Sequence, residues 1–384
     1  MKNKKAMAII GLMIFLLLSG CASEPTTNES VIEEDHLAAE TADELPEVEQ
    51  GRATTPAEQV DDVPVIEQAE GLHNNQPEQL TTVNEQEAFT EFFSPFTGLP
   101  INKLILDRVV MVSIGNSIMA RPQEGLAEAE FVYEFLVEGG VTRLLALYWG
   151  DIPDKIGPVR SVRPYIIETA LEFDALLLHA GACPTGFELL ERRQVEHLDQ
   201  IFNSRYYWRS NERKPPYNLY TGNNKFSPYL KKLTGQEYKT RFPFQRISFI
   251  NANDLKANKI KINYWGNYRV YYRYDPDKNI YYRYISDQEQ PHYDGNGSQL
   301  NTRNLIVQYA ATRVIDSVGR LSIDLNSTGK ALIFKDGIVK GGYWEKPADD
   351  WTKFYGQDGQ EIRLNPGKTW IQVVPDSTKV DFKE

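Results

Sequence analysis

The sequence predicts an α+β protein in which a mixed α/β domain over residues 92–245 is followed by a β-rich domain over residues 246–384. Three observations predict this organisation. Helical and strand-like hydrophobic periods alternate in the first range, and short strands separated by Asp-Gly and Asn-Pro-Gly turns fill the second. Residues 22–91 are rich in Glu, Asp, Thr, Gln and Pro and have no apolar period. Because such a segment cannot bury enough apolar surface to offset its ordering entropy, we expect a disordered tether before the two domains.

Residues 1–21 are typical of a secretory signal. Three lysines precede an apolar run from Ala6 to Leu18, which is shorter than the about 20 residues of a membrane span. The ending Leu-Ser-Gly-Cys matches the bacterial lipobox, which implies that Cys21 is diacylated and becomes the mature N-terminus. Since two acyl chains anchor stably, we expect a lipid-anchored protein at the extracytoplasmic face of the cell membrane. The alternative is an ordinary secreted protein whose cysteine happens to follow the cleavage site.

The acidic charge of the chain is confined to the tether. Residues 22–90 contain 18 Asp and Glu against one basic residue, whereas the part beyond the signal and this segment has 35 acidic and 38 basic residues. A nucleic-acid binder is expected to carry a clustered basic face, so nucleic acid is disfavoured as a partner. If lipid modifies Cys21, Cys183 is the remaining cysteine and no internal disulfide can form.

The first domain is expected to begin with an aromatic turn segment over residues 92–100. A buried strand is expected over residues 107–114, which are rich in β-branched side chains. A polar turn ending in Arg121 and a short helical turn over residues 126–129 follow. Apolar side chains then alternate over residues 131–137, and Gly139-Gly140 leads into residues 141–149. This pattern predicts a β-hairpin.

On that interpretation Glu134 and Glu138 lie on one face of the hairpin, and Arg143 lies across the turn. The functional hypothesis is a charged cluster at a cleft, with Glu138 as a candidate general base. The alternative is a solvated sheet face with a surface ion pair, which contributes about 0–1 kcal/mol.

Two arginines precede a predicted helix over residues 165–173. Arg160 and Arg163 come just before Pro164, and proline suits the first turn of a helix. The N–H groups and the dipole of a helix N-terminus favour an anion, and arginines bind phosphate, carboxylate or sulfate in a bidentate manner. The alternative is that each arginine pairs with a carboxylate of the protein itself, such as Glu134 or Glu138.

His179 ends an apolar, strand-like run over residues 175–178, at a position where α/β proteins often place site residues. It is a candidate general base, although a lone histidine is also compatible with a hydrogen bond inside the fold. Cys183 follows without a signature of a thiolate nucleophile and is expected to be buried and unpaired. Residues 186–198 are expected to form another helix.

Residues 199–220 interleave aromatic and cationic side chains, a composition suited to stacking on sugars or to contacts with an anionic polymer. The alternative is a Tyr-rich loop that covers the domain. The candidate ligand-binding residues of the whole chain are Arg121, Glu134, Arg143, Arg160, Arg163, Tyr165, Arg209, Arg213, Tyr217 and Asn218.

The second domain is expected to be a meander of short strands. A strand over residues 246–249 and a short helix or turn over residues 251–258 precede it. The stretch YRVYYRYDPDKNIYYRYISD resembles a hairpin whose tyrosines and arginines pack across strands rather than on a ligand. Residues 294–298 (DGNGS) lack the rest of a calcium loop and are expected to form a turn. Since the chain has no P-loop, GxSxG, HExxH, paired CxxC or dinucleotide motif, we expect no cofactor and no metal.

Several motifs occur in the order seen in the YerB-like lipoproteins, also known as the DUF3048 family. PFTGLP, ARPQEGLAEAEFVYEFLVEGGVTRLLALYW, IGPVRSVRPYIIETALEFDALLLHAGACPTGF and RKPPYNLYT resemble its motifs, and the resemblance extends from Pro95 to Pro375. It implies an N-terminal and a C-terminal domain behind a lipoprotein signal. Because no activity is established for the family, it supplies no catalytic residue. Relatives more usually have Gly-Ser where this chain has Ala182-Cys183, which argues against an essential Cys183.

These observations favour a membrane-anchored lipoprotein that binds an anionic or carbohydrate ligand of the cell envelope, such as a cell-wall polymer. Two other functions stay open. One is an envelope enzyme that transfers or hydrolyses a glycosyl or phosphoryl group, with His179 or Glu138 as its base. The other is a scaffold for an unknown protein partner.

Overall fold

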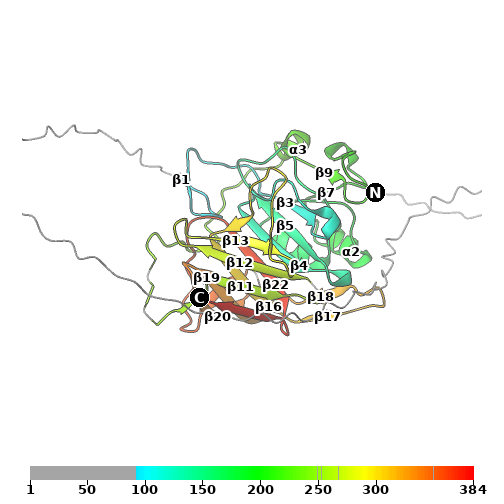
Figure 1. Cartoon of the computed structure of the whole chain (residues 1–384). Coiled ribbons are helices and arrows are strands. Elements are labelled where there is room, and N and C mark those ends of the chain that lie inside the picture. Colours follow the sequence, from blue (N-terminus) through cyan, green and yellow to red (C-terminus); the bar gives the residue numbers. More distant parts are fainter. Residues whose placement is uncertain (1–91, 249, 252, 267, 349) are drawn as a thin grey trace, which may run out of the picture. The chain divides into compact units, whose positions relative to one another are not determined.

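The computed structural model describes residues 92–248, 250–251, 253–266, 268–348 and 350–384 (Figure 1). All of them belong to one compact unit of the chain. The predicted signal over residues 1–21, with Cys21, and the predicted tether over residues 22–91 lie outside the described residues. Within the described part the α+β prediction is confirmed, because three α-helices accompany several β-sheets.

The largest sheet has 11 strands, and strands from both predicted domains share it. The first domain contributes β3 (Val110–Gly115), β4 (Phe131–Leu136), β5 (Thr142–Tyr148), β6 (Leu176–His179) and β7 (His197–Asp199). The second contributes β10 (Leu255–Lys256), β16 (Asn304–Ala310), β19 (Thr328–Lys335), β20 (Ile338–Glu345), β21 (Lys353–Gly356) and β22 (Thr369–Pro375). The order across the sheet is β10-β20-β19-β16-β22-β4-β5-β3-β6-β7, with β21 paired to β20.

The predicted strands of the first domain are confirmed. β3 is buried along its whole length, as a run of β-branched and apolar residues predicts for a strand covered on both faces. β4 and β5 form the expected antiparallel hairpin, with Phe135 opposite Arg143. The three-residue 3-10 helix η2 (Glu138–Gly140) connects them, and the predicted helical turn over residues 126–129 is a turn without a helix.

Three α-helices are present in the described residues: α1 (Pro164–Glu172), α2 (Pro184–Arg192) and α3 (Asn223–Leu230). Helix α1 begins with Pro164, as expected, and α2 begins with Pro184, two residues before its predicted start. The predicted helix over residues 186–198 is wrong in its second half, because Gln194 has a left-handed φ of 48° and the chain then enters β7. Two further 3-10 helices are η1 (Ile118–Ala120) and η3 (Ser204–Tyr206).

A second sheet has six strands and comes from the C-terminal half of the chain. The expected hairpin is confirmed, with Tyr272 directly opposite Arg283. The strands are β11 (Lys259–Asn263), β12 (Arg269–Asp275), β13 (Ile280–Ile285), β14 (Gln290–Pro291), β15 (Asn301–Thr302) and β23 (Lys379–Lys383). Three two-stranded sheets complete the fold: β1 (Phe92–Phe93) with β2 (Pro100–Ile101), β8 (Trp208–Arg209) with β9 (Leu219–Tyr220), and β17 (Thr312–Val314) with β18 (Leu321–Ile323).

The meander expected for the second domain is wrong in its last strands. β22 lies between β16 and β4 and is parallel to both, whereas β23 joins the other sheet. Residues 246–248 are exposed and form no strand, and residues 255–256 form the short strand β10 instead of a helix. Residues 295–296 form the expected turn. The boundary at residue 245 stays a prediction, since one sheet contains strands from both sides of it.

Opposite faces of β4 carry different partners because successive strand residues point to opposite sides. On one face the rings of Phe135 and Tyr165 lie 5.6 Å apart, and those of Tyr133 and Phe173 lie 6.2 Å apart, so α1 covers this face. On the other face Glu134 meets Arg283 of β13. Strands β4 and β5 therefore lie between a helical layer and the six-stranded sheet.

The contact between Glu134 and Arg283 is a buried ion pair. The Arg283 Nη2 to Glu134 Oε2 distance is 2.8 Å, and both side chains are 0% exposed. Tyr268 and Thr142 donate to Glu134 Oε1 at 2.9 and 2.7 Å. Burial alone would lower the pKa of Arg283, but the Glu134 charge together with Tyr272 and Tyr268 outweighs burial, so the pKa lies above the ordinary value. The pair therefore has the additional hydrogen bonds that a buried charge requires.

Replacement of Glu134 tests this pair. Glu134→Gln keeps the shape of the side chain but leaves the Arg283 charge buried without a counter-charge, so we expect a loss of about 3–5 kcal/mol in the free energy of unfolding, measured with urea. The control is Glu289→Gln, which removes the exposed pair with Arg273 and should cost no more than about 1 kcal/mol. Equal losses of unfolding free energy in Glu134→Gln and Glu289→Gln would contradict a stabilising role for the buried pair.

Candidate functional site

Arg143, Arg160 and Arg163 gather with Glu138 beside Ser161, and we call these four residues the arginine cluster. Arg143 Nη1 donates to the carbonyl oxygen of Ser161 at 2.7 Å and to its hydroxyl at 2.9 Å. Arg163 Nη1 donates to the same hydroxyl at 3.0 Å. Arg143 and Arg163 thus share one hydroxyl, and Ser161 lies between them.

The segment before α1 is fixed by the ends of two strands. The Arg160 N–H donates to the carbonyl of Ser113 in β3 at 2.9 Å, and the Arg160 carbonyl accepts from the Ala180 N–H at 3.1 Å. Gly115 permits a close approach here, since a Cβ at this position would lie 2.8 Å from Arg160 Cγ. The aliphatic stem of Arg160 therefore lies against the end of β3.

Two helices begin side by side next to the cluster. Val162 and Ala182 form a parallel bridge, and each precedes the first proline of its helix by two residues. Arg163 is the residue before α1, and Cys183 is the residue before α2. The partial positive charges of both helix N-termini therefore add to the charge of the arginines.

Positive charge exceeds negative charge in the arginine cluster. Glu138 accepts from Arg163 Nε at 2.6 Å and from Nη2 at 2.9 Å. Burial raises the pKa of Glu138, but the hydrogen bonds and charge of Arg163 outweigh it, so the net change is downward. Burial, together with the charges of Arg163 and Arg160, lowers the pKa of Arg143 to about 9. Arg143 is 7% exposed, and in the described part of the chain its Nε has no hydrogen-bond partner.

The expectation that Glu134 and Glu138 share one face is wrong. Glu138 lies beyond the end of β4 and pairs with Arg163, whereas Glu134 lies within the strand and points to the opposite side. Arg121 belongs to the same opposite side, because its Nε donates to Asn116 Oδ1 at 3.1 Å and Asn116 donates to Glu134. Glu134 therefore neutralises Arg283, and within the described part of the chain the carboxylate that pairs with the arginine cluster is Glu138.

The Tyr-rich loop contributes one ring to the cluster. The guanidinium of Arg160 lies 5.4 Å from the centre of the Tyr217 ring. Arg213 instead donates to the carbonyls of Ala120 and Pro122, at 2.8 and 2.6 Å. Arg209 donates to Asn218 Oδ1 at 2.9 Å. Arg209, Arg213 and Asn218 thus hold the loop. Arg160 contacts the loop at the Tyr217 ring and donates from Nη1 to the Pro216 carbonyl at 3.4 Å.

His179 lies inside the protein and is 0% exposed. Its Nδ1 is 2.9 Å from the Gly181 carbonyl, which can only accept, so Nδ1 carries the proton and Nε2 accepts from His197 Nδ1 at 3.0 Å. Burial lowers the pKa of His179 from 6.5 to about 4, although the Asp199 charge acts in the opposite direction. Because the His179 side chain is not exposed, its accessibility gives no support to a catalytic role, and that role stays a prediction. Cys183 is buried and unpaired, as expected.

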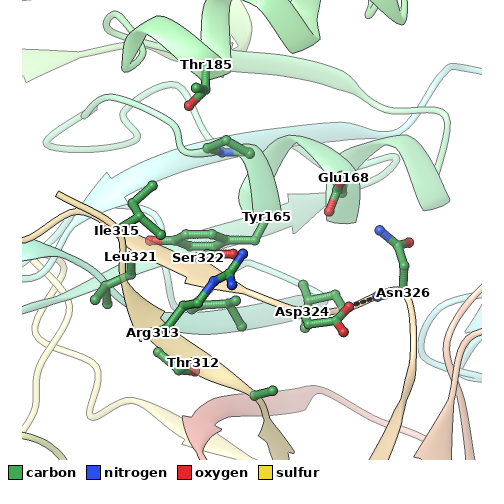
Figure 2. A pocket seen from close by; sticks show the side chains of 14 residues that line it. Tyr165, Glu168, Thr185, Thr312, Arg313, Ile315, Leu321, Ser322, Asp324 and Asn326 are labelled. Carbon is green, nitrogen blue, oxygen red and sulfur yellow. Dashed lines mark hydrogen bonds between the residues drawn. The ribbon is translucent and has the colours of Figure 1, made fainter.

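A cavity of about 670 Å³ lies between α1 and the β17–β18 hairpin (Figure 2). Tyr165 connects it to the arginine cluster: its ring lines the cavity, and its hydroxyl donates to the Leu136 carbonyl at 3.0 Å, two residues before Glu138. Tyr165 was predicted from the sequence as a ligand-binding residue, whereas the polar residues around it were not. These polar residues come from distant segments, so no local sequence pattern identifies them. They are Glu168, Thr185, Arg313, Ser322, Asp324 and Asn326.

Comparison with known proteins defines the class to which this fold belongs. Residues 96–238 match the N-terminal domain and residues 260–371 the C-terminal domain of a family described as "Protein of unknown function (DUF3048)". The chain belongs to this family, and the resemblance found in its motifs is confirmed.

Two relatives support this assignment. The chain is 33% identical over 297 residues to the "Putative lipoprotein YerB" of Bacillus subtilis strain 168, and the match covers 74% of this chain and 86% of the relative. The crystal structure of the YerB protein from Bacillus subtilis matches with a TM-score of 0.69 and 30% identity, over 76% of this chain and 100% of that chain. No helix among the described residues is long and apolar enough to cross a membrane.

The protonation of His179 predicts a pH dependence of stability. Its pKa in the folded state lies below the ordinary 6.5, so the unfolded chain binds the proton first as the pH falls. The stabilisation is present above about pH 6.5 and is lost toward about pH 4. When the pH falls from about 7 to about 5, the unaltered protein should lose roughly 2 kcal/mol more free energy of unfolding than the His179→Asn variant does. Urea unfolding at both pH values is the measurement, and parallel losses in both proteins would refute the prediction.

Proposed function

We propose that this chain is a membrane-anchored lipoprotein that binds an anionic ligand of the cell envelope at the arginine cluster. The lipobox ending in Cys21 and the lipoprotein name of the Bacillus relative support the anchor, which would hold the folded part at the extracytoplasmic face. Cys21 itself lies outside the described residues.

The observation that carries the binding proposal is the buried charge of Arg143, which the Glu138 carboxylate offsets only in part. Its side chain is almost fully buried, its Nε lacks a partner among the described residues, and the charges of Arg160 and Arg163 help to lower its pKa to about 9. A buried cation in this situation is stabilised by a counter-charge. A bound anion would supply that charge.

The geometry favours phosphate or carboxylate among anions, because the planar guanidinium group binds both through two parallel hydrogen bonds. Two helix N-termini beside the arginines add backbone donors and partial positive charge. The Tyr217 ring next to Arg160 offers a surface on which a sugar ring could stack. These features fit a polymer that carries both sugars and acidic groups.

Binding is better supported than catalysis at this site. Glu138 has a lowered pKa because Arg163 holds its carboxylate, which makes it a weaker base. His179, the other candidate base, is enclosed by the fold.

Binding of full-length protein in detergent micelles to purified bacterial cell walls tests the proposal. Arg160→Gln should weaken cosedimentation about tenfold, because a charge-assisted hydrogen bond contributes about 1.5–3 kcal/mol. Added salt should weaken binding of the unaltered protein. The matched control is Arg192→Gln, which changes an exposed arginine at the C-terminal end of α2 and should bind as the unaltered protein does.

Cell walls stripped of phosphate polymers, and walls with amidated carboxylates, distinguish the two kinds of anion. Loss of binding in either preparation identifies the acidic group. Undiminished binding by Arg160→Gln, or binding that persists when both groups are removed, would refute the arginine cluster as the site.

A further inference from the structure

We propose that the cavity between α1 and the β17–β18 hairpin binds an uncharged sugar unit of a glycan. The inference rests on the proposed function in that the sugar would belong to the same envelope polymer whose acidic group meets the arginine cluster. It adds a second contact site, with a different chemistry, to that function.

The cavity has the size and the walls of a small-ligand site. Its volume of about 670 Å³ lies within the roughly 300–1,000 Å³ that is usual for such sites. Helix α1 contributes Pro164, Tyr165 and Glu168 to one wall, and the hairpin and the segment after it contribute the opposite wall. The two walls come from distant parts of the sequence.

One end of the cavity is rich in hydrogen-bond acceptors. Figure 2 shows Glu168, Asp324 and Asn326 near one another at one side of the view. The Asn326 backbone N–H donates to Asp324 Oδ1 at 3.0 Å. The nearby Asn326 side chain acts to lower the pKa of Glu168. Carboxylate oxygens accept several hydrogen bonds each, so hydroxyl groups of a sugar suit this end.

The middle of the cavity holds Arg313 and Ser322 beside the Tyr165 ring, and the other end is less polar. The Tyr165 ring lies in its wall, and Ile315 and Leu321 lie on the side away from Asp324 and Asn326 (Figure 2). A sugar ring has a polar edge of hydroxyls and an apolar face of C–H groups. The acceptors of the cavity match the hydroxyl edge of a sugar, and the aromatic ring and aliphatic side chains match its C–H face.

Two carboxylates, Glu168 and Asp324, and one cation, Arg313, line the cavity, so its net charge is negative and disfavours an anionic sugar. Burial raises the pKa of Glu168, and the negative charge of Asp324 adds to this effect, although Lys346 acts in the opposite direction. Lys346 already pairs with Glu172 at 2.8 Å. A further negative charge beside the two carboxylates would be repelled, whereas an uncharged hydroxyl would not.

The position of the cavity lets one glycan reach both sites. Pro164 and Thr185 line the cavity and belong to the first turns of α1 and α2, where the arginine cluster lies. A sugar unit in the cavity would therefore leave the acidic group of the same polymer near Arg163.

Titration of full-length protein in detergent micelles with two uncharged oligosaccharides tests the proposal. Chitotetraose represents N-acetylated amino sugars and maltotetraose represents hexoses, and calorimetry measures their affinity. We expect one of them to bind, and Asp324→Asn to weaken that binding about tenfold, since hydrogen bonds to a charged acceptor are lost. Asn326→Ala should also weaken it and serves as a second variant if the first does not fold.

The matched control is Asp316→Asn, a carboxylate in the turn of the same hairpin that does not line the cavity. It should bind the oligosaccharide as the unaltered protein does. Failure of both oligosaccharides to bind, unchanged affinity in the Asp324 and Asn326 variants, or tighter binding of the cationic glucosamine tetramer would each overturn the proposal. Arg160→Gln should retain oligosaccharide binding while it loses cell-wall binding, so the failure of one site is distinguishable from the failure of the other.

Discussion

The buried ion pair between Glu134 and Arg283 is the constraint on which the rest of the structure depends. It joins β4 of the large sheet to β13 of the second sheet, and neither side chain is exposed. Gln372 of β22 donates to Glu134 Oε2 at 2.9 Å, so the strand inserted between the two halves of the sheet shares the same carboxylate. A charged pair of this kind stabilises the fold only while every partner is in place, because either charge alone would be costly. Three distant segments are thus held in one register.

The two faces of the β4–β5 hairpin have different electrostatic character as a consequence. Towards the second sheet, the Glu134 charge is balanced by Arg283 and saturated by hydrogen bonds. Towards α1, Arg143 is buried beside Arg160 and Arg163, and the Glu138 carboxylate offsets part of their charge. The first face stabilises the fold, and the second keeps donors in a fixed arrangement that an anion could use. Such preorganised donors lower the cost of ordering on binding.

The sequence predicted those features that follow from local pattern. The strand at residues 110–115, the hairpin around Gly139-Gly140 and the helix after Pro164 each have their own hydrophobic period or turn signal. The arginines before that helix were identified because a helix N-terminus favours anions. By contrast, the pairing of Glu134 with Arg283, the place of β22 and the lining of the cavity depend on residues far apart in sequence. Residues 246–248 show the converse error, since a strand-like composition without a partner strand stays exposed.

Arginine-selective labelling with phenylglyoxal, read by mass spectrometry with and without solubilised cell-wall polymer, tests the central claim most directly. Reactivity follows the accessibility of each guanidinium group, and Arg192 at the far end of α2 provides an internal reference. The account predicts that the polymer protects Arg160 and leaves Arg192 as reactive as before. Equal labelling of Arg160 with and without polymer, under conditions where the polymer is bound, would contradict it.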